Sequence, residues 1–281
     1  NTGFSYLPDI VSRRFAEVLA KKSALHFDDA YVLYTTGRTG GSNLLYLKHT
    51  NSLGSMDRQL LEAYTRSVAI TFENINLQED MRETQQELVY GLANALEGRN
   101  QNMGAHARRV AVTCEMLARL AGLPETQVQQ IKTASPLHDI GKSGISDSIL
   151  CKMGKLSADE WALMQQHAQF GLDILHGSQR PLMQLGAEIA ASHHERWDGT
   201  GYPHGLSGPG IPIAGRIAAL ADVFDTLGSR RSYKEAWPED QVEQAIREGR
   251  GTQFDPALVD LLLANLPAFT ALRQQFPDTG T

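Results

Sequence analysis

Cysteine is scarce in this sequence. Cys114 and Cys151 are the only two cysteines in 281 residues, and they form no closely spaced pair. This scarcity excludes a disulfide-stapled fold and favours a reducing cytoplasm as the compartment. Long apolar runs are also missing, since none approaches the roughly 20 residues that a membrane-spanning helix needs. We therefore expect neither membrane insertion nor a signal peptide.

Positive charge is in deficit as well. Lys and Arg number 26 against 32 Asp and Glu, which gives a formal net charge of −6. Polymeric nucleic acid is therefore not an expected partner, because phosphate binding depends on clustered cations. An anionic ligand requires that cations gather locally. The 42% of hydrophobic and 21% of charged residues are typical of a globular protein with a core.

Residues 1–56 predict a small α+β region. An amphipathic helix is expected over 10–22, and two β-like runs at 31–34 and 44–47 favour a hairpin. The glycine-rich stretch between the runs lacks the Lys-Ser/Thr pair of a phosphate-binding loop, so it predicts a plain turn. So little strand cannot form a stable sheet alone, and we expect a partial domain.

Proline is absent and glycine nearly absent over 57–97, where apolar residues recur every three to four positions. This pattern predicts one long helix of about 60 Å. An ordinary packed helix pair is the alternative. A helix of this length cannot bury its apolar stripe against so small a neighbour, which favours a homodimer through this helix.

The rest of the chain, 98–281, predicts helices and one large loop. Helices are expected over 108–121, 158–176, 186–194, 216–228, 238–248 and 256–266. The stretch 197–212 is crowded with glycine and proline, so it predicts a shaped loop. The expected fold is mainly α: a C-terminal all-α bundle, preceded by a long linker helix and a small α+β N-terminal part.

Histidines beside carboxylates are the strongest chemical signal in the sequence. His138-Asp139 places an imidazole next to a carboxylate that can bridge two ions, and His193-His194 forms a second pair. The single residues His106, His167 and Asp222 complete the candidates. Five imidazoles and two carboxylates are too many ligands for one tetrahedral ion and about right for two.

With these motifs in order, the sequence resembles the HD-GYP phosphodiesterases of bacterial cyclic dinucleotide signalling. The resemblance spans roughly residues 90–266. The segments that carry it are HARRV at 106–110, HDIGK at 138–142, His167, HHERWDGTGYP at 193–203, DVFD at 222–225 and GTQFDP at 251–256. The part before residue 90 resembles the tail of a GAF-like sensory domain.

This resemblance implies roles for individual residues. The implied metal ligands are His106, His138, Asp139, His167, His193, His194 and Asp222, with Asp139 bridging two ions. Lys142, Arg231 and Lys234 match positions that contact substrate phosphate, and Tyr202 of the GYP run is a further substrate-binding candidate. Asn102 stands where some members carry a third-metal carboxylate, which argues for two ions. Iron or manganese is favoured for both.

The implied function is hydrolysis of the 3′–5′ phosphodiester bonds of a cyclic dinucleotide to linear dinucleotide or mononucleotide. A hydroxide that bridges the ions attacks phosphorus, while Asp139 and Lys142 are the catalytic residues. Cyclic di-GMP and cyclic GMP-AMP both stay open as substrates. The alternatives are a cyclic dinucleotide receptor with little turnover and a one-metal nucleotide phosphohydrolase. A receiver or other signalling domain upstream of this chain is a further candidate partner.

Overall fold

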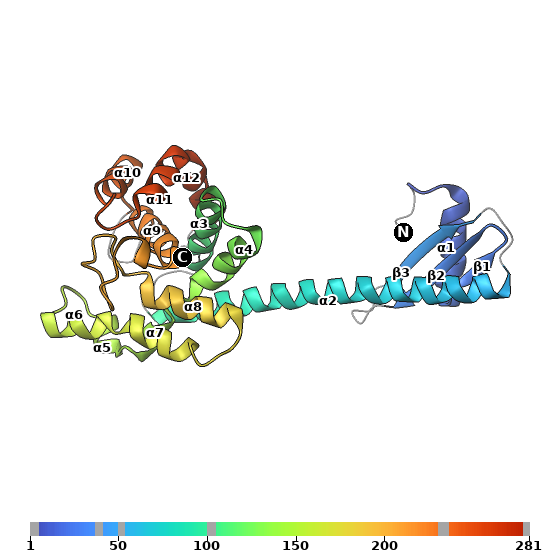
Figure 1. Ribbon diagram of the computed structural model, residues 1–281, viewed down its shortest axis with the longest axis horizontal. Helices are drawn as coiled ribbons and strands as arrows, with labels where there is room; N and C mark the ends of the chain where they lie inside the picture. Colours follow the sequence, from blue (N-terminus) through green and yellow to red (C-terminus); the bar gives the residue numbers. More distant parts are fainter. Residues whose placement is uncertain (1–5, 37–41, 50–53, 100–104, 230–235, 278–281) are drawn as a thin grey trace. The chain divides into compact units, whose positions relative to one another are not determined.

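The computed structural model describes residues 6–36, 42–49, 54–99, 105–229 and 236–277 (Figure 1). The chain divides into two compact units, Asn1–Thr84 and Gln85–Thr281. None of the described helices combines the length and apolar character that a bilayer span requires. The fold is mainly helical with one small sheet, as the sequence predicts.

The first unit contains α1(Asp9–Lys21) and an antiparallel sheet of three strands, β1(Leu25–Phe27), β2(Ala30–Thr36) and β3(Ser42–Lys48), in the order β1-β2-β3. The predicted hairpin is present, and Val32 pairs with Tyr46. Its turn lies outside the described residues. Strand β1 was not predicted, because three residues give too short an alternation to detect.

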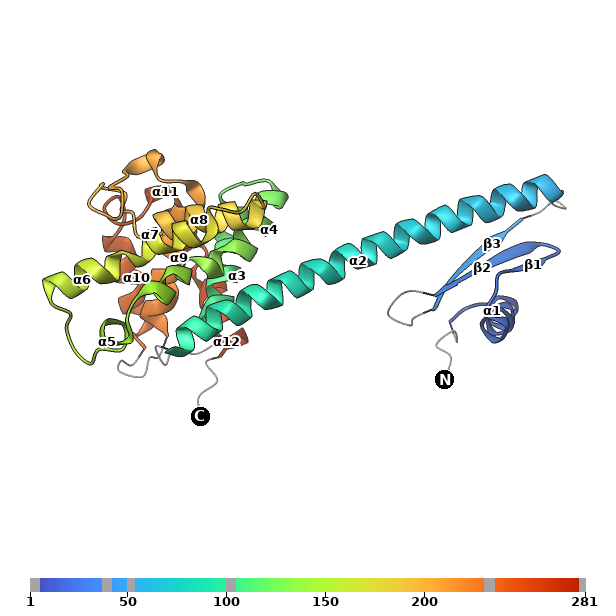
Figure 2. The same ribbon diagram turned by 90° about the horizontal axis from the view of Figure 1, so that it is seen from below.

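The sheet lies between α1 and the first part of α2(Ser55–Arg99) (Figure 2). On the α1 face, Phe15 and Val18 pack with Val32. On the other face, Tyr31 and Thr65 are both buried and share a hydrogen bond. Successive strand residues point to opposite faces, which places Tyr31 and Val32 on different sides of the sheet. A helix on each face therefore covers the sheet.

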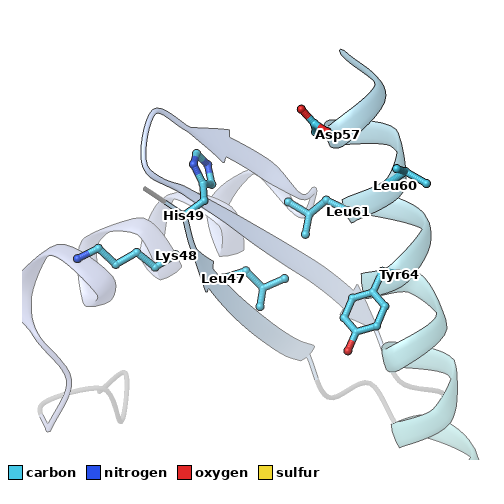
Figure 3. A pocket seen from close by; sticks show the side chains of 7 residues that line it. All are labelled: Leu47, Lys48, His49, Asp57, Leu60, Leu61 and Tyr64. Atoms are coloured by element: carbon cyan, nitrogen blue, oxygen red, sulfur yellow. The ribbon is translucent and has the colours of Figure 1, made fainter. Parts of the chain in front are cut away.

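A mainly apolar pocket of about 440 Å³ lies in the first unit, where the end of β3 meets the start of α2 (Figure 3). Leu47 and Leu61 line its floor, while Lys48, His49 and Asp57 supply polar groups at its edge. Leu60 and Tyr64 of α2 complete the lining and are each 64% exposed. The pocket is thus an open hollow beside an exposed apolar helix face.

The long helix predicted over 57–97 is present as α2, a single helix of 45 residues. Near its C-terminal end, Val89 and Ala93 are buried in the second unit. Along the rest of the helix, large apolar side chains are more than half exposed: Met56, Leu60, Tyr64, Ile70, Phe72, Ile75, Met81, Leu88 and Leu92. The predicted apolar stripe therefore faces solvent over most of its length.

The second unit is a bundle of helices around one large apolar core (Figure 1). Its α-helices are α3(His106–Leu120), α4(Glu125–Ala134), α5(Asp147–Leu150), α6(Ala158–Gln165), α7(His167–Leu175), α8(Pro181–Ser192), α9(Ile213–Gly228), α10(Glu239–Glu248), α11(Pro256–Ala264) and α12(Leu266–Gln275). Helix α3 packs against α4 and α9, and α8 packs against α7 and α9. Helices α3 and α7 begin with His106 and His167, and His193 directly follows α8. The contacts between these helices therefore bring the candidate ligands together.

Two predicted helices are broken in the structure. The helix expected over 158–176 stops at Gln165, and a new one begins at His167. The His167 imidazole bonds to the Met164 carbonyl, which turns this side chain away from the surface. The helix expected over 256–266 stops at Ala264 and α12 follows, because Pro267 lacks the N–H that a continuous helix requires.

Candidate metal centre

The structure brings all seven predicted metal ligands together in the second unit. They form two groups, within each of which the ligand atoms lie within 4.8 Å of one another. The first group contains Asp139, His167, His193 and His194, and the second contains His106, His138 and Asp222. Five segments far apart in the sequence supply these side chains, so the cluster exists only in the folded chain.

Asp139 stands between the two groups. Its Oδ1 lies 3.5 Å from His167 Nε2 and 3.8 Å from His193 Nε2. Its Oδ2 lies 3.3 Å from His138 Nε2 in the other group. A carboxylate with one oxygen toward each set of imidazoles has the arrangement that a bridging metal ligand needs.

A close backbone contact sets the position of this carboxylate. Asp139 precedes the short 3₁₀ segment Ile140–Gly144, which packs against α7. A Cβ added to Gly141 would lie 1.9 Å from the carbonyl oxygen of His167. Only glycine permits this approach, because the atoms that a Cβ would meet belong to the backbone of α7 and cannot turn aside as a flexible side chain can. Gly141 therefore brings Asp139 within reach of His167.

Three histidines have their ring orientation fixed by backbone carbonyls. The Nδ1 atoms lie 2.9 Å from the Ser135 oxygen for His138, 2.7 Å from the Met164 oxygen for His167 and 3.0 Å from the Ala190 oxygen for His193. A carbonyl only accepts, so each Nδ1 must carry the proton. In His167 and His193 the Nε2 then keeps its lone pair and points to the cluster, the form in which histidine binds metal, and the Nε2 of His138 also faces the cluster.

His106 is oriented by a buried ion pair instead. Its Nδ1 lies 2.8 Å from Asp225 Oδ2, and the Arg109 Nε donates to Asp225 Oδ1 at 2.7 Å. Arg109 also donates to the Phe276 carbonyl at 2.9 Å. Sequence reasoning gave no role to Arg109 or Asp225, although Asp225 lies one helical turn after Asp222. The two residues are 116 positions apart, so their pairing has no local signal.

Two buried atoms of the cluster favour a cation site there. Among the described residues, His138 Nε2 and Asp139 Oδ1 are buried side-chain atoms with no hydrogen-bond partner. An unpaired buried donor or acceptor costs about 1–3 kcal/mol, so such atoms need an explanation. Both belong to the predicted ligand set and face its interior. A bound cation accounts for both atoms at once.

Electrostatics give the side chains the charges that metal binding requires. Burial lowers the pKa of His193 to about 3 and also lowers the pKa of His167 and His194, so these rings are neutral. Burial raises the pKa of Asp139, but Lys142 and His138 outweigh it and hold that pKa well below its usual range. Neutral imidazoles and charged carboxylates are the forms that ligate metal.

His138 differs from the other histidines. Burial lowers its pKa, but the carboxylates of Asp139 and Asp222 outweigh burial and raise the pKa to about 9. The two carboxylates thus draw positive charge into the cluster. The donor set of imidazoles and carboxylates, together with this demand for positive charge, fits divalent metal ions.

The loop 197–212 covers one side of the cluster. Tyr202 stacks on His194, with ring centroids 4.7 Å apart and an angle of 27°. The buried Glu195 accepts hydrogen bonds from the backbone N–H groups of His204 at 2.8 Å and Leu206 at 3.0 Å. Glu195 lies within the motif at 193–203, but the sequence alone indicates no role for it. Its two bonds fix the loop that carries Tyr202.

Of the predicted phosphate-contacting residues, only Lys142 lies among the residues that the structure describes. Lys142 donates a hydrogen bond to Asp139 Oδ2, and its side chain is 29% exposed. It therefore lies beside the bridging carboxylate and within reach of solvent. Arg231, Lys234 and Asn102 lie outside the described residues, so their proposed roles stay predictions.

Comparison with known proteins defines the class. Residues 91–258 match the family model described as HD domain, so the chain belongs to the HD domain family. The seven candidate metal ligands all lie within the matched residues. Residues 3–81 match a domain of unknown function (DUF3369). The predicted GAF-like character of the first unit is not confirmed by this match.

Named relatives and a solved structure are similar to the chain. It is 51% identical over 275 residues to 3′3′-cGAMP-specific phosphodiesterase 2 of Vibrio cholerae, covering 98% of this chain and 53% of that protein. It is 41% identical over 235 residues to the cyclic di-GMP phosphodiesterase response regulator RpfG of Xanthomonas campestris, covering 84% of this chain and 60% of that protein. The chain thus spans little more than half the length of these relatives.

A solved structure of a cyclic GMP-AMP specific phosphodiesterase of V. cholerae (V-cGAP3) matches with a TM-score of 0.51 and 23% identity. The match covers 69% of this chain and 51% of that one. At this identity the match shows a shared fold. It agrees with the mainly helical fold class that the sequence predicts.

Proposed function

We propose that this chain is a metal-dependent phosphodiesterase that cleaves the 3′–5′ bonds of a cyclic dinucleotide, cyclic di-GMP or cyclic GMP-AMP. The observation that carries the proposal is the position of Asp139 between two groups of ligands. Two adjacent metal ions are suited to in-line displacement at a phosphodiester, because they stabilise both the attacking and the leaving oxygen. The names of the similar proteins support this substrate class.

The chain's own residues have defined parts in this proposal. His106, His138 and Asp222 hold one ion, while His167, His193 and His194 hold the other. Two bound divalent ions would activate water at neutral pH and neutralise phosphate charge. Asp139 fixes the spacing of the two groups, and Lys142 binds a phosphate oxygen. The proton for the leaving 3′ oxygen comes from Lys142 or from a water bound at the centre.

We further propose that the two ions are iron or manganese. The donor set is rich in imidazole and contains carboxylates but no thiolate, which suits these metals at least as well as zinc. Asn102 lies outside the described residues, and an amide there supplies no third-metal carboxylate. We expect close to two ions per chain.

Anaerobic purification, metal analysis and incubation with each cyclic dinucleotide test the proposal directly. We expect hydrolysis of at least one of them, seen as linear dinucleotide or mononucleotide after chromatographic separation. Activity should disappear with chelator and return with iron or manganese. Tight binding without turnover in the metal-loaded chain would contradict the proposal and favour the receptor alternative. One tightly held zinc without activity would indicate a structural site.

The parts of the chain divide the work in this proposal. Residues 98–281 form the phosphodiesterase domain, 57–97 the linker and dimerisation helix, and 1–56 a sensory region. The exposed apolar stripe on α2 supports a homodimer, because monomeric proteins rarely leave such a long contiguous apolar surface in water. The cytoplasmic compartment and an upstream signalling domain stay predictions.

A further inference from the structure

A half-exposed tryptophan lies close to the metal centre and has no part in holding metal. Trp161 of α6 is 49% exposed, although its ring lies 6.4 Å from the ring of Tyr202 at an angle of 82°. Tyr202 in turn stacks on His194, one of the candidate ligands. The three rings form an aromatic row that runs from the metal centre to the surface of the bundle.

The position of Trp161 is fixed with respect to the ligands. Helix α6 begins with a capping box, in which Ser157 and Glu160 satisfy each other's backbone N–H groups. Lys152 donates to both Glu160 oxygens, at 2.7 and 2.6 Å, and ties the preceding loop to the helix. His167 follows Trp161 by only six residues, at the start of α7. The indole is thus held on a short, capped helix beside a ligand.

The other two tryptophans differ from Trp161 in their surroundings. The Arg216 guanidinium lies over the Trp197 ring, 5.8 Å from its centroid. The backbone N–H of Trp197 donates to the Gln253 carbonyl. The Trp237 backbone N–H bonds to the Leu227 carbonyl, and its side chain packs against the main core. Trp161 alone combines an exposed ring with the aromatic row that leads to the cluster.

We propose that Trp161 is a base-stacking residue that contacts one purine of the substrate while the phosphate lies at the metal centre. This inference rests on the proposed phosphodiesterase function. The base of a nucleotide projects from the sugar that carries the phosphate, so a base-binding surface must lie beside the phosphate site. Aromatic side chains bind bases through their faces without reading sequence. Trp161 supplies such a face, and the ring of Tyr202 connects it to His194 by one contact on each side.

Steady-state kinetics on the full chain test this role. Stacking contributes about 1–3 kcal/mol per base, and the lower part of that range applies to a half-exposed ring. We therefore expect Trp161→Ala to raise KM for the cyclic dinucleotide about 5- to 20-fold with little change in kcat. Trp161→Phe keeps an aromatic face, and we expect its KM to stay within about threefold of the parent.

Leu163→Ala is the matched control. Leu163 lies on the same helix and is 45% exposed, but two residues turn it to the opposite side. We expect its KM to equal that of the parent. Inhibition by inorganic phosphate, which has no base, and bound metal should stay unchanged in Trp161→Ala. A change in either would show that the substitution disturbs the centre itself, and would overturn the base-stacking role.

Tryptophan emission gives a readout that does not need turnover. Rapid mixing of the metal-loaded chain with a cyclic dinucleotide should quench the tryptophan emission before any turnover, and Trp161→Phe should lose that quenching while Trp197 and Trp237 still emit. Unchanged KM in Trp161→Ala, or quenching that survives in Trp161→Phe, overturns the inference. A parent chain that hydrolyses no cyclic dinucleotide refutes the proposed function instead, and the emission measurement still decides whether Trp161 binds a base.

Discussion

At the scale of single residues, Asp139 is the side chain on which the whole centre depends. Its two oxygens face the two ligand groups, so in the proposed two-metal centre its loss would remove one ligand from each ion. We expect Asp139→Ala to lower turnover below about 1% of the parent and to reduce bound metal. Asp139→Asn should fail as well, since a neutral amide bridges poorly. Near-normal turnover and metal content in Asp139→Ala, measured by mass spectrometry of the metals, would refute the two-metal assignment.

Asp225 tests whether the buried pair positions His106. Asp225→Asn keeps an acceptor for the His106 ring but removes the charge that Arg109 neutralises. Mutation of a residue that hydrogen-bonds to a metal-binding histidine typically lowers metal affinity or activity about 10- to 100-fold. We expect a loss in that range, measured by competition with a chelator.

The matched control for this change is Asp260→Asn. Asp260 also pairs with an arginine, Arg250, but its side chain is 56% exposed, and exposed pairs contribute little. We expect metal affinity in Asp260→Asn to equal that of the parent. Equal affinities in both variants would mean that Asp225 has a structural role only.

The histidines of the metal-free centre predict opposite pH effects on stability. The pKa of His193 is lowered from the ordinary 6.5 to about 3, so the unfolded chain binds more protons and stability is lost as pH falls through this range. The pKa of His138 is raised to about 9, so its contribution is present below pH 6.5 and is lost as pH rises toward 9. Each group changes the free energy of unfolding by at most about 1.4 kcal/mol per pH unit.

We therefore expect the metal-free chain to be most stable near pH 6.5, the ordinary pKa of histidine that both shifts start from. Urea unfolding after chelator treatment, at a series of pH values, measures this directly. Bound metal should change the profile, because protons then compete with the ions. A free energy of unfolding that rises steadily from neutral to alkaline pH would contradict the assigned charge of His138.

At the scale of elements, the sequence predicts helices well where their apolar stripe is strong. The long α2 and the amphipathic α3 follow from periodicity alone. Helix α4 was missed because it buries only Val128, Ile131 and Ala134 in a glutamine-rich stretch. The break at Gln166 was also missed; beside it the His167 ring donates to the Met164 carbonyl, a contact that the local pattern does not show. Tertiary contacts, which local patterns do not contain, decide such cases.

In the candidate site, too, some residues could be predicted from the sequence and others could not. The candidate metal ligands were predictable because all but His167 stand in short motifs that resemble those of a known family, and His167 lies between two of those motifs, in the same order along the chain. Arg109, Asp225 and Glu195 were not, although all three are buried and hold parts of the site. Their functions consist of contacts with residues distant in sequence or with backbone N–H groups of a loop. Only the folded chain defines those contacts.

Gly141 links an element contact to the chemistry. Its Cβ in Gly141→Ala would approach the His167 oxygen to 1.9 Å and the Gly171 nitrogen to 2.4 Å. The Ile140–Gly144 segment would have to move away from α7, at a cost of about 1–3 kcal/mol. We expect reduced thermal stability together with weaker metal binding, because Asp139 moves with this segment.

Gly91→Ala provides the control for this substitution. A Cβ at Gly91 meets nothing within 4 Å, and the residue lies inside α2. We expect Gly91→Ala to leave metal binding unchanged and to raise stability by about 0.5–1 kcal/mol. Metal affinity in Gly141→Ala equal to that of Gly91→Ala would show that the close approach of this segment is not needed for the centre.

At the scale of the whole molecule, α2 is the feature that the rest of the fold leaves unexplained. Its exposed apolar side chains form no part of either core. Close to its C-terminal end, Val89 packs in a small cluster with Leu137, which immediately precedes His138. A movement of α2 would therefore reach the metal ligands through a packed contact. Homodimer formation along the stripe is a means of producing such a movement.

The last prediction joins the dimer to the activity. Phe72 and Ile75 are more than half exposed and lie before the Gln85 boundary of the second unit, so Phe72→Glu with Ile75→Glu leaves the catalytic bundle intact. We expect the parent to have about twice the 30.9 kDa mass of one chain in light scattering, and the double variant to be monomeric.

Turnover should change several-fold on dissociation, because a misplacement of about 1 Å at reacting groups costs up to a hundredfold in rate. Glu73→Gln lies on the same helix but is turned away from both Phe72 and Ile75, so it should change neither property. A double variant that is monomeric with the turnover of the parent would reduce α2 to a tether. A parent that is already monomeric would remove the dimer itself.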